Sequence, residues 1–214
     1  MTRFKVCCIQ TLEEARLAVA HGASALGLVS AMPSGPGVIE EDKIREIAMA
    51  TPPPIATFLL TSLTDATLIL EQVRYCATGV VQLCDRTSEE TRAKLRKYAP
   101  HVRIVQVVHV TGPESLAEAK TAARGSDALL LDSGSFAAPV KELGGTGRSH
   151  DWGLSKKIVK AVKVPVFLAG GLHAENAAEA CRQVQPYALD VCSGLRTNGA
   201  LDAAKLEAFR KATA

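Results

Sequence analysis

Eight short apolar segments alternate along this chain with eight longer segments that have helical patterns. The apolar segments are rich in Val, Ile and Leu and nearly continuous, which is typical of parallel strands buried on both faces. They span residues 4–9, 25–30, 55–60, 79–83, 103–110, 128–132, 164–169 and 188–192. The helical patterns span residues 12–20, 41–49, 65–75, 89–97, 114–123, 154–162, 174–183 and 203–212. Thr11, Thr64 and Ser88 stand where helix caps are expected, so the sequence predicts eight strand–helix units.

Eight such units fold either into a closed barrel or into an open doubly wound sheet. An open sheet usually carries glycines after its first strand, but the first predicted strand ends in Cys7-Cys8-Ile9-Gln10. Glycine pairs instead follow the sixth, seventh and eighth strands. This placement favours an α/β protein with a single (β/α)8 TIM barrel, whose phosphate sites commonly lie in the last loops. Because no linker, internal repeat or low-complexity tract is present, we expect residues 1–214 to form one domain.

Composition and charge exclude several classes of function. The net charge of +3 is weak and scattered, so nucleic acid is not expected as a partner, whereas a small anionic substrate is compatible with it. No apolar stretch approaches the ~18 residues of a membrane span, and no signal segment follows the amino terminus. We therefore expect a cytoplasmic protein without membrane contact, either a monomer or a homodimer.

The residues that could bind metals do not have ligand spacing. The six cysteines lack the Cys-x-x-Cys pattern, and the five histidines are spread along the chain. We expect neither a metal nor an organic cofactor.

Three glycine groups are expected to converge on one rim of the barrel, because each follows a predicted strand. Glycine lets backbone N–H groups approach an anion closely, and consecutive free amides form a nest for phosphate oxygens. Any one group could simply make a tight turn, but three together favour a phosphate site. Its candidate residues are Gly145, Gly147, Gly170, Gly171, Ser193 and Gly194.

Two titratable residues are expected at strand ends on the same rim. Cys7 stands late in the first apolar segment, and Asp132 ends the sixth. A carboxyl group at the edge of a dry strand has its charged form disfavoured, which suits a general acid. A thiol among positive dipoles is favoured as the thiolate, which suits a general base. The alternatives are a buried core thiol and a capping carboxylate, and the residues alone leave them open.

A series of motifs follows in the order of a known family. It comprises Lys5-Val6-Cys7, Gly22-Ala23, Val81-Gln82-Leu83, Leu130-Leu131-Asp132-Ser133, Gly144-Gly145-Thr146-Gly147 with Asp151-Trp152, Leu168-Ala169-Gly170-Gly171-Leu172, Leu189-Asp190-Val191-Cys192-Ser193-Gly194 and the closing segment 201–206. The chain thereby resembles the phosphoribosylanthranilate isomerase family of tryptophan biosynthesis over nearly its whole length. The second half of the resemblance is specific, and the first half is more diluted.

The resemblance implies an Amadori rearrangement of a phosphorylated sugar. In the family, the aspartate matching Asp132 is the general acid that helps to open the ribose ring. The cysteine matching Cys7 is the general base that removes the proton from C2 of the sugar. Asp190 matches a position that contacts the substrate, and the glycine loops match the family's phosphate site.

Three departures from the family pattern fall on the side of the pocket that would bind anthranilate. Cys8 replaces a glycine, and Cys84-Asp85 replaces His-Gly. The arginine of a Ser-Pro-Arg signature, which binds the anthranilate carboxylate, is absent near Pro36. Either another cation takes its place, with Arg86, Lys141 and Arg148 as candidates, or the substrate is a different phosphorylated amino sugar. A third possibility is a non-catalytic barrel that keeps only the phosphate site.

Overall fold

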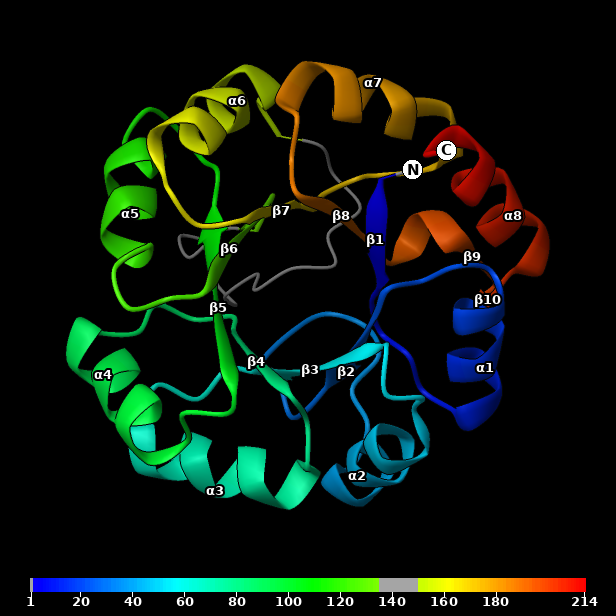
Figure 1. Ribbon diagram of the computed structural model, residues 1–214. Coiled ribbons are helices and arrows are strands. Elements are labelled where there is room, and N and C mark those ends of the chain that lie inside the picture. Colours follow the sequence, from blue (N-terminus) through cyan, green and yellow to red (C-terminus); the bar gives the residue numbers. More distant parts are fainter. Residues whose placement is uncertain (1, 135–149) are drawn as a thin grey trace.

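Eight parallel strands close into a barrel, and a ring of helices surrounds them (Figure 1). This computed structural model describes residues 2–134 and 150–214. The strands lie in the order of the sequence around the barrel, and β8 pairs with β1 to close it. They are β1 (Arg3–Val6), β2 (Ala25–Val29), β3 (Ala56–Thr61), β4 (Val80–Leu83), β5 (Arg103–His109), β6 (Ala128–Asp132), β7 (Val166–Leu168) and β8 (Ala188–Val191). The predicted (β/α)8 TIM barrel is confirmed.

The helices occupy the predicted segments with ends that differ by up to two residues. They are α1 (Leu12–Ala20), α2 (Glu41–Ala50), α3 (Ala66–Cys76), α4 (Glu89–Tyr98), α5 (Ser115–Ala122), α6 (Trp152–Ala161), α7 (Ala174–Val184) and α8 (Ala203–Ala212). Thr11 and Ser88 cap α1 and α4 as predicted. The prediction for Thr64 is wrong, because Asp65 caps α3 by accepting from Thr67 N at 2.8 Å.

The first strand is shorter than predicted because the backbone turns at Cys8. Cys8 has a φ of 61°, a left-handed conformation that no strand residue adopts. At the other end of the chain, the 3-10 helix η1 (Ser193–Leu195) follows β8 and leads into the hairpin strands β9 (Arg196–Thr197) and β10 (Ala200–Leu201). Arg196 of β9 binds Glu14 of α1 through Nη1 and Oε1 at 2.7 Å, and it also donates to the carbonyl oxygen of Cys8. The hairpin therefore supports the turn after β1.

Apolar side chains form two separate clusters. The larger lies between the strands and the helices and includes Phe4, Leu26 and Phe209. The smaller fills the inside of the barrel and includes Phe58 and Phe167 together with several alanines. The two phenylalanine rings meet edge to face with centroids 5.7 Å apart. A chain with few aromatic residues thus builds its core from small and branched side chains.

The two ends of the described chain meet where the barrel closes (Figure 1). Thr2 N donates to Thr213 O at 2.7 Å, and the rings of Phe4 in β1 and Phe209 in α8 lie 5.5 Å apart. Where β1 pairs with β8, Lys5 is directly opposite Asp190, and Val6 is opposite Val191. In the described segments, no helix is long and apolar enough to cross a bilayer.

Candidate active site

The carboxyl ends of the strands surround a cavity of about 680 Å³, a volume that includes the space at its open mouth. Six residues of the predicted site line it, namely Cys7, Asp132, Gly170, Gly171, Asp190 and Ser193. Gly194 lies behind the lining, and Gly145 and Gly147 lie outside the described residues.

Cys7 is the first residue after β1, and its backbone holds it against the neighbouring strand. Its N–H donates to Val191 O at 2.8 Å, which continues the pairing of β1 with β8. On the other side lies Gly27 of β2, where an added Cβ would be 3.0 Å from Cys7 Sγ. The thiol is 7% exposed and faces the cavity. Cys7 thus belongs to the apolar cluster inside the barrel and also borders the cavity.

Asp132 ends β6 with its carboxyl group at the cavity and almost fully buried. Burial raises the pKa of Asp132 to about 6, and the negative charge of Asp190 acts in the same direction. The N–H of Ser133, which donates to Oδ1 at 2.7 Å, and the charge of Lys5 oppose the rise. The carboxyl group therefore keeps its proton to a higher pH than an ordinary aspartate, which suits a general acid.

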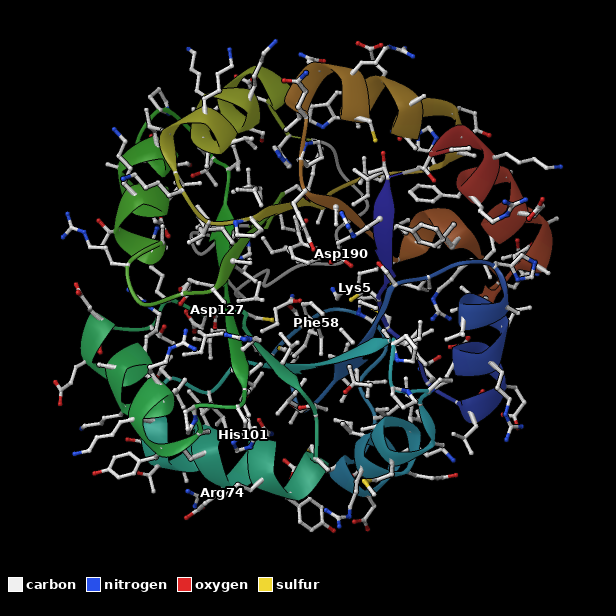
Figure 2. The ribbon with its side chains drawn as sticks, in the orientation of Figure 1. Lys5, Phe58, Arg74, His101, Asp127 and Asp190 are labelled. Carbon is white, nitrogen blue, oxygen red and sulfur yellow. The ribbon has the colours of Figure 1, made fainter. Side chains whose placement is uncertain are left out.

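Lys5 is a residue of the site that the sequence did not single out as functional. Its ammonium group is fully buried and lies 2.7 Å from Asp190 Oδ1, and it also lies 5.3 Å from the centre of the Phe58 ring. Figure 2 shows the three side chains together inside the barrel. Burial alone would lower the pKa of Lys5, but Asp190 and the thiols of Cys7 and Cys8 outweigh it, so the net shift is upward. Asp190, predicted as a substrate contact, is thus also the partner of a buried cation.

Three further thiols line the cavity beside Cys7. Burial, with the nearby Cys7, raises the pKa of Cys84 to about 12. Hydrogen bonds with Cys192 and Cys7, together with burial, raise the pKa of Cys8. The Cys8 thiol and the guanidinium of Arg196 lower the pKa of Cys192, although burial opposes them. Cys8 and Cys84 are accordingly neutral thiols near pH 7.

Gln82 of β4 also lines the cavity, although the sequence indicates it only as part of the Val81-Gln82-Leu83 motif. Its side chain is 4% exposed, and its amide nitrogen lies 3.7 Å from Cys84 Sγ. Among the described residues, Oε1 has no hydrogen-bond partner. A buried amide oxygen of this kind is ready to accept a hydrogen bond from a ligand.

Two glycine loops meet at the predicted phosphate site. Gly170 and Gly171 have φ values of 82° and 63°, which other residues rarely adopt. Gly194 lies so close to the same loop that an added Cβ would be 2.0 Å from the carbonyl oxygen of Leu172. Gly194 thus allows the loops after β7 and β8 to touch, while Gly171 and Ser193 reach the cavity.

Residues 4–212 match the family described as N-(5'phosphoribosyl)anthranilate (PRA) isomerase. The chain belongs to this family. An N-(5'-phosphoribosyl)anthranilate isomerase 2 from Methanosarcina mazei is 38% identical over 209 residues, which cover 97% of this chain and 92% of that protein.

Solved structures of PRA isomerases have the same fold. The monomers generated from the dimeric Thermotoga maritima enzyme match with a TM-score of 0.81 at 27% identity, covering 100% of this chain and 98% of that one. A phosphoribosyl anthranilate isomerase in complex with reduced 1-(o-carboxyphenylamino)-1-deoxyribulose 5-phosphate matches with a TM-score of 0.80, also at 27% identity and with the same coverage.

The side of the cavity that departs from the PRA isomerase pattern lies close to Cys8. Ser34, Gly35 and Pro36 line the cavity there, and the segment 34–37 contains no arginine. Gly37 has a φ of 82°, and a Cβ on it would lie 2.4 Å from the Cβ and 2.9 Å from the Cα of Cys8. A side chain at position 37 therefore does not fit this backbone.

The candidate replacements for that arginine are not at the cavity in the described residues. Arg86 forms a two-pronged bridge with Glu118 of α5, with N–O distances of 2.9 and 2.8 Å, and does not line the cavity. Lys141 and Arg148 lie outside the described residues. Asp85 also lies outside the lining, and its backbone oxygen accepts from Gln106 Nε2 at 2.9 Å.

Proposed function

We propose that the protein catalyses the Amadori rearrangement of N-(5′-phosphoribosyl)anthranilate to 1-(o-carboxyphenylamino)-1-deoxyribulose 5-phosphate, a step of tryptophan biosynthesis. The observation that carries the proposal is the meeting, in one cavity, of the Asp132 carboxyl group, whose pKa burial raises to about 6, and the thiol of Cys7. The family match over residues 4–212 and the bound molecule of the related structure support the same substrate.

The two side chains can perform both proton transfers of an aldose–ketose rearrangement. Asp132 gives its proton to the ring oxygen of the ribose, and the C1–O bond breaks while the anilinic nitrogen forms an iminium group with C1. The Cys7 thiolate then removes the proton from C2, which gives an enolamine. Tautomerisation moves a proton to C1, releases the proton of the C2 hydroxyl and yields the ketone. No metal or organic cofactor takes part in these steps.

The phosphate group is assigned to the glycine loops. Gly170, Gly171 and Ser193 border the cavity, and Gly194 lets the two loops approach. We include Gly145 and Gly147 from the sequence alone. Backbone N–H groups of such loops bind phosphate without placing further charge beside Asp132.

The first experiment is turnover by the purified protein, followed as the loss of anthranilate-type fluorescence. Cys7→Ala and Asp132→Asn should each lower kcat by about 10²–10⁴-fold, the usual contribution of a general acid or base. Cys181→Ala, on the outer helix α7, is the matched control and should keep full activity. Absence of turnover by the wild-type protein would refute the proposal.

A second candidate is the rearrangement of a different phosphorylated amino sugar. The specific observation in its favour is that none of the described residues lining the cavity is cationic, so an anthranilate carboxylate has no evident partner among them. Complementation of a tryptophan auxotroph that lacks the isomerase separates the candidates, because growth would exclude the second.

We also propose that residues 1–214 form one cytoplasmic domain that acts as a monomer or homodimer and binds no nucleic acid. The barrel uses elements from Arg3 to Ala212, and its six cysteines are free thiols, which supports this organisation. Light scattering on the purified protein would give the number of subunits.

A further inference from the structure

The ion pair between Lys5 and Asp190 lies near both reacting groups of the proposed mechanism, because Lys5 is close to Cys7 and both charges act on Asp132. Lys5 and Cys7 are two residues apart in an extended segment, so their side chains leave the backbone on the same side. Both line the space beside Gly27, where a single added Cβ would lie 3.0 Å from Cys7 Sγ and 3.0 Å from Lys5 Cε. The thiol and the lysine side chain are therefore close neighbours.

Burying this ion pair costs desolvation free energy, and the packing around it does not require a charged pair. Lys5 is fully buried and Asp190 is 7% exposed, and removing two charges from water is unfavourable even when they pair. The surrounding side chains of the barrel interior, such as Phe58 and Phe167, are apolar. An apolar pair would fill this space without removing charges from water.

Resting on the proposed function, we propose that Lys5 and Asp190 act as positioning charges that hold Cys7 as the base and Asp132 as the acid. The Lys5 ammonium faces the Cys7 thiolate and stabilises its negative charge. Asp190 repels a second negative charge at Asp132 and so keeps the proton on that carboxyl group.

The direction of each effect follows from the charges that face the pair. Asp190 raises and Lys5 lowers the pKa of Asp132, so the two charges have opposite effects there. On β2 and β3 the facing residues are Gly27 and Phe58, which carry no charge. Within residues 2–134 and 150–214, the other titratable groups that line the cavity around the pair are Cys7 and Cys8 after β1, Cys84 after β4, Asp132 on β6 and Cys192 after β8.

The test replaces the charges without shortening the side chains. In Lys5→Met, alkylation of Cys7 by iodoacetamide at neutral pH should slow about tenfold or more, because the thiolate has lost its counter-charge. The high-pH limb of kcat/KM, assigned to Asp132, should also move upward, because Asp190 is no longer compensated.

The double variant Lys5→Met/Asp190→Asn should distinguish the effect of Lys5 on Cys7 from the effect of Asp190 on Asp132. Alkylation of Cys7 should still be slower than in the wild type, whereas the Asp132 limb should return below its position in Lys5→Met. The double variant contains no unpaired buried charge, so it also decides the question if Lys5→Met fails to fold. Lys43→Met, which removes an exposed lysine of α2, is the matched control and should shift neither profile.

Tandem mass spectrometry assigns the label to Cys7 rather than Cys8, and Cys181 serves as the internal reference for the reagent. An unchanged Cys7 alkylation profile in both variants would overturn the proposal, even if turnover had fallen. This readout needs no substrate. If the wild type fails to turn over the substrate, the proposed function fails while the alkylation profiles still decide whether Lys5 acts on Cys7.

Discussion

Burial raises the pKa of Asp132 to about 6, so the folded protein holds a proton on this residue more tightly than the unfolded chain does. For a carboxyl group with a raised pKa, the stabilisation is complete below the unfolded value near 4 and is lost as the pH rises to about 6. Above pH 6 the folded protein must keep a buried negative charge. The proposed acid therefore lowers stability at neutral pH.

Asp132→Asn should stabilise the protein at pH 8 by up to about 3 kcal/mol, because a neutral amide does not carry this charge. At pH 4 the difference from the wild type should nearly vanish. Urea unfolding of both proteins at the two pH values measures it.

Asp127→Asn is the control of opposite sign for that experiment. Burial opposes ionisation of Asp127, but its bonds to Arg96 and to the N–H of Ile104 outweigh burial and lower its pKa. Loss of this carboxylate should destabilise the protein at pH 8, and the effect should shrink as the pH falls. If Asp132→Asn also destabilised the protein at pH 8, the assignment of Asp132 as a buried acid would be wrong.

At the scale of elements, the contact between the loops after β7 and β8 depends on Gly194. A Cβ there would lie 2.0 Å from the carbonyl oxygen of Leu172, and a backbone atom cannot move aside as a side-chain end can. Gly194→Ala should therefore cost about 1–3 kcal/mol, as overpacking usually does. It should also raise KM, because η1 and the Gly170-Gly171 loop would separate.

Gly79→Ala is the matched control for this substitution. A Cβ at Gly79 meets no atom within 4 Å, so alanine should be neutral or slightly stabilising. Chemical denaturation and steady-state kinetics on both variants provide the comparison. Equal effects of the two substitutions would contradict the assigned role of Gly194.

At the scale of the whole molecule, closure of the barrel joins the first strand to the last helix. Phe209 is fully buried, and its ring packs against that of Phe4. Phe209→Ala should lower the free energy of unfolding by about 3–5 kcal/mol, because it leaves an empty space between β1 and α8. Tyr98→Ala, which removes an exposed ring from α4, should change stability little. Unfolding in urea monitored by circular dichroism tests both.

The barrel could be predicted from the sequence because strands covered on both faces leave nearly continuous apolar runs. The ends of the strands are harder to predict. β1 ends at Val6, shortly before Cys8 adopts a left-handed backbone conformation, which a cysteine in the sequence does not indicate. The β9–β10 hairpin was missed although Asn198-Gly199, both with positive φ, is a strong turn signal. Two-residue strands leave no hydrophobic period to detect.

The site could be predicted where it depends on strand ends, because parallel strands place their carboxyl ends on one rim. Cys7 and Asp132 follow from that rule. The role of Lys5 does not follow from its place in the Lys5-Val6-Cys7 motif, although a lysine inside a buried strand requires a carboxylate nearby. Its pairing with Asp190, distant in the sequence, arises only when β8 closes on β1.

The close approach of Gly37 to Cys8 couples the segment after β2 to the turn after β1. A Cβ at position 37 would lie 2.4 Å from the Cβ and 2.9 Å from the Cα of Cys8, and the φ of Gly37 is 82°. A longer side chain at position 37 therefore requires the backbone of one of the two segments to move. An engineer who wants a cation on this side of the cavity should place it at a lining residue such as Met32 or Ser34, where no change of the backbone at position 37 is needed.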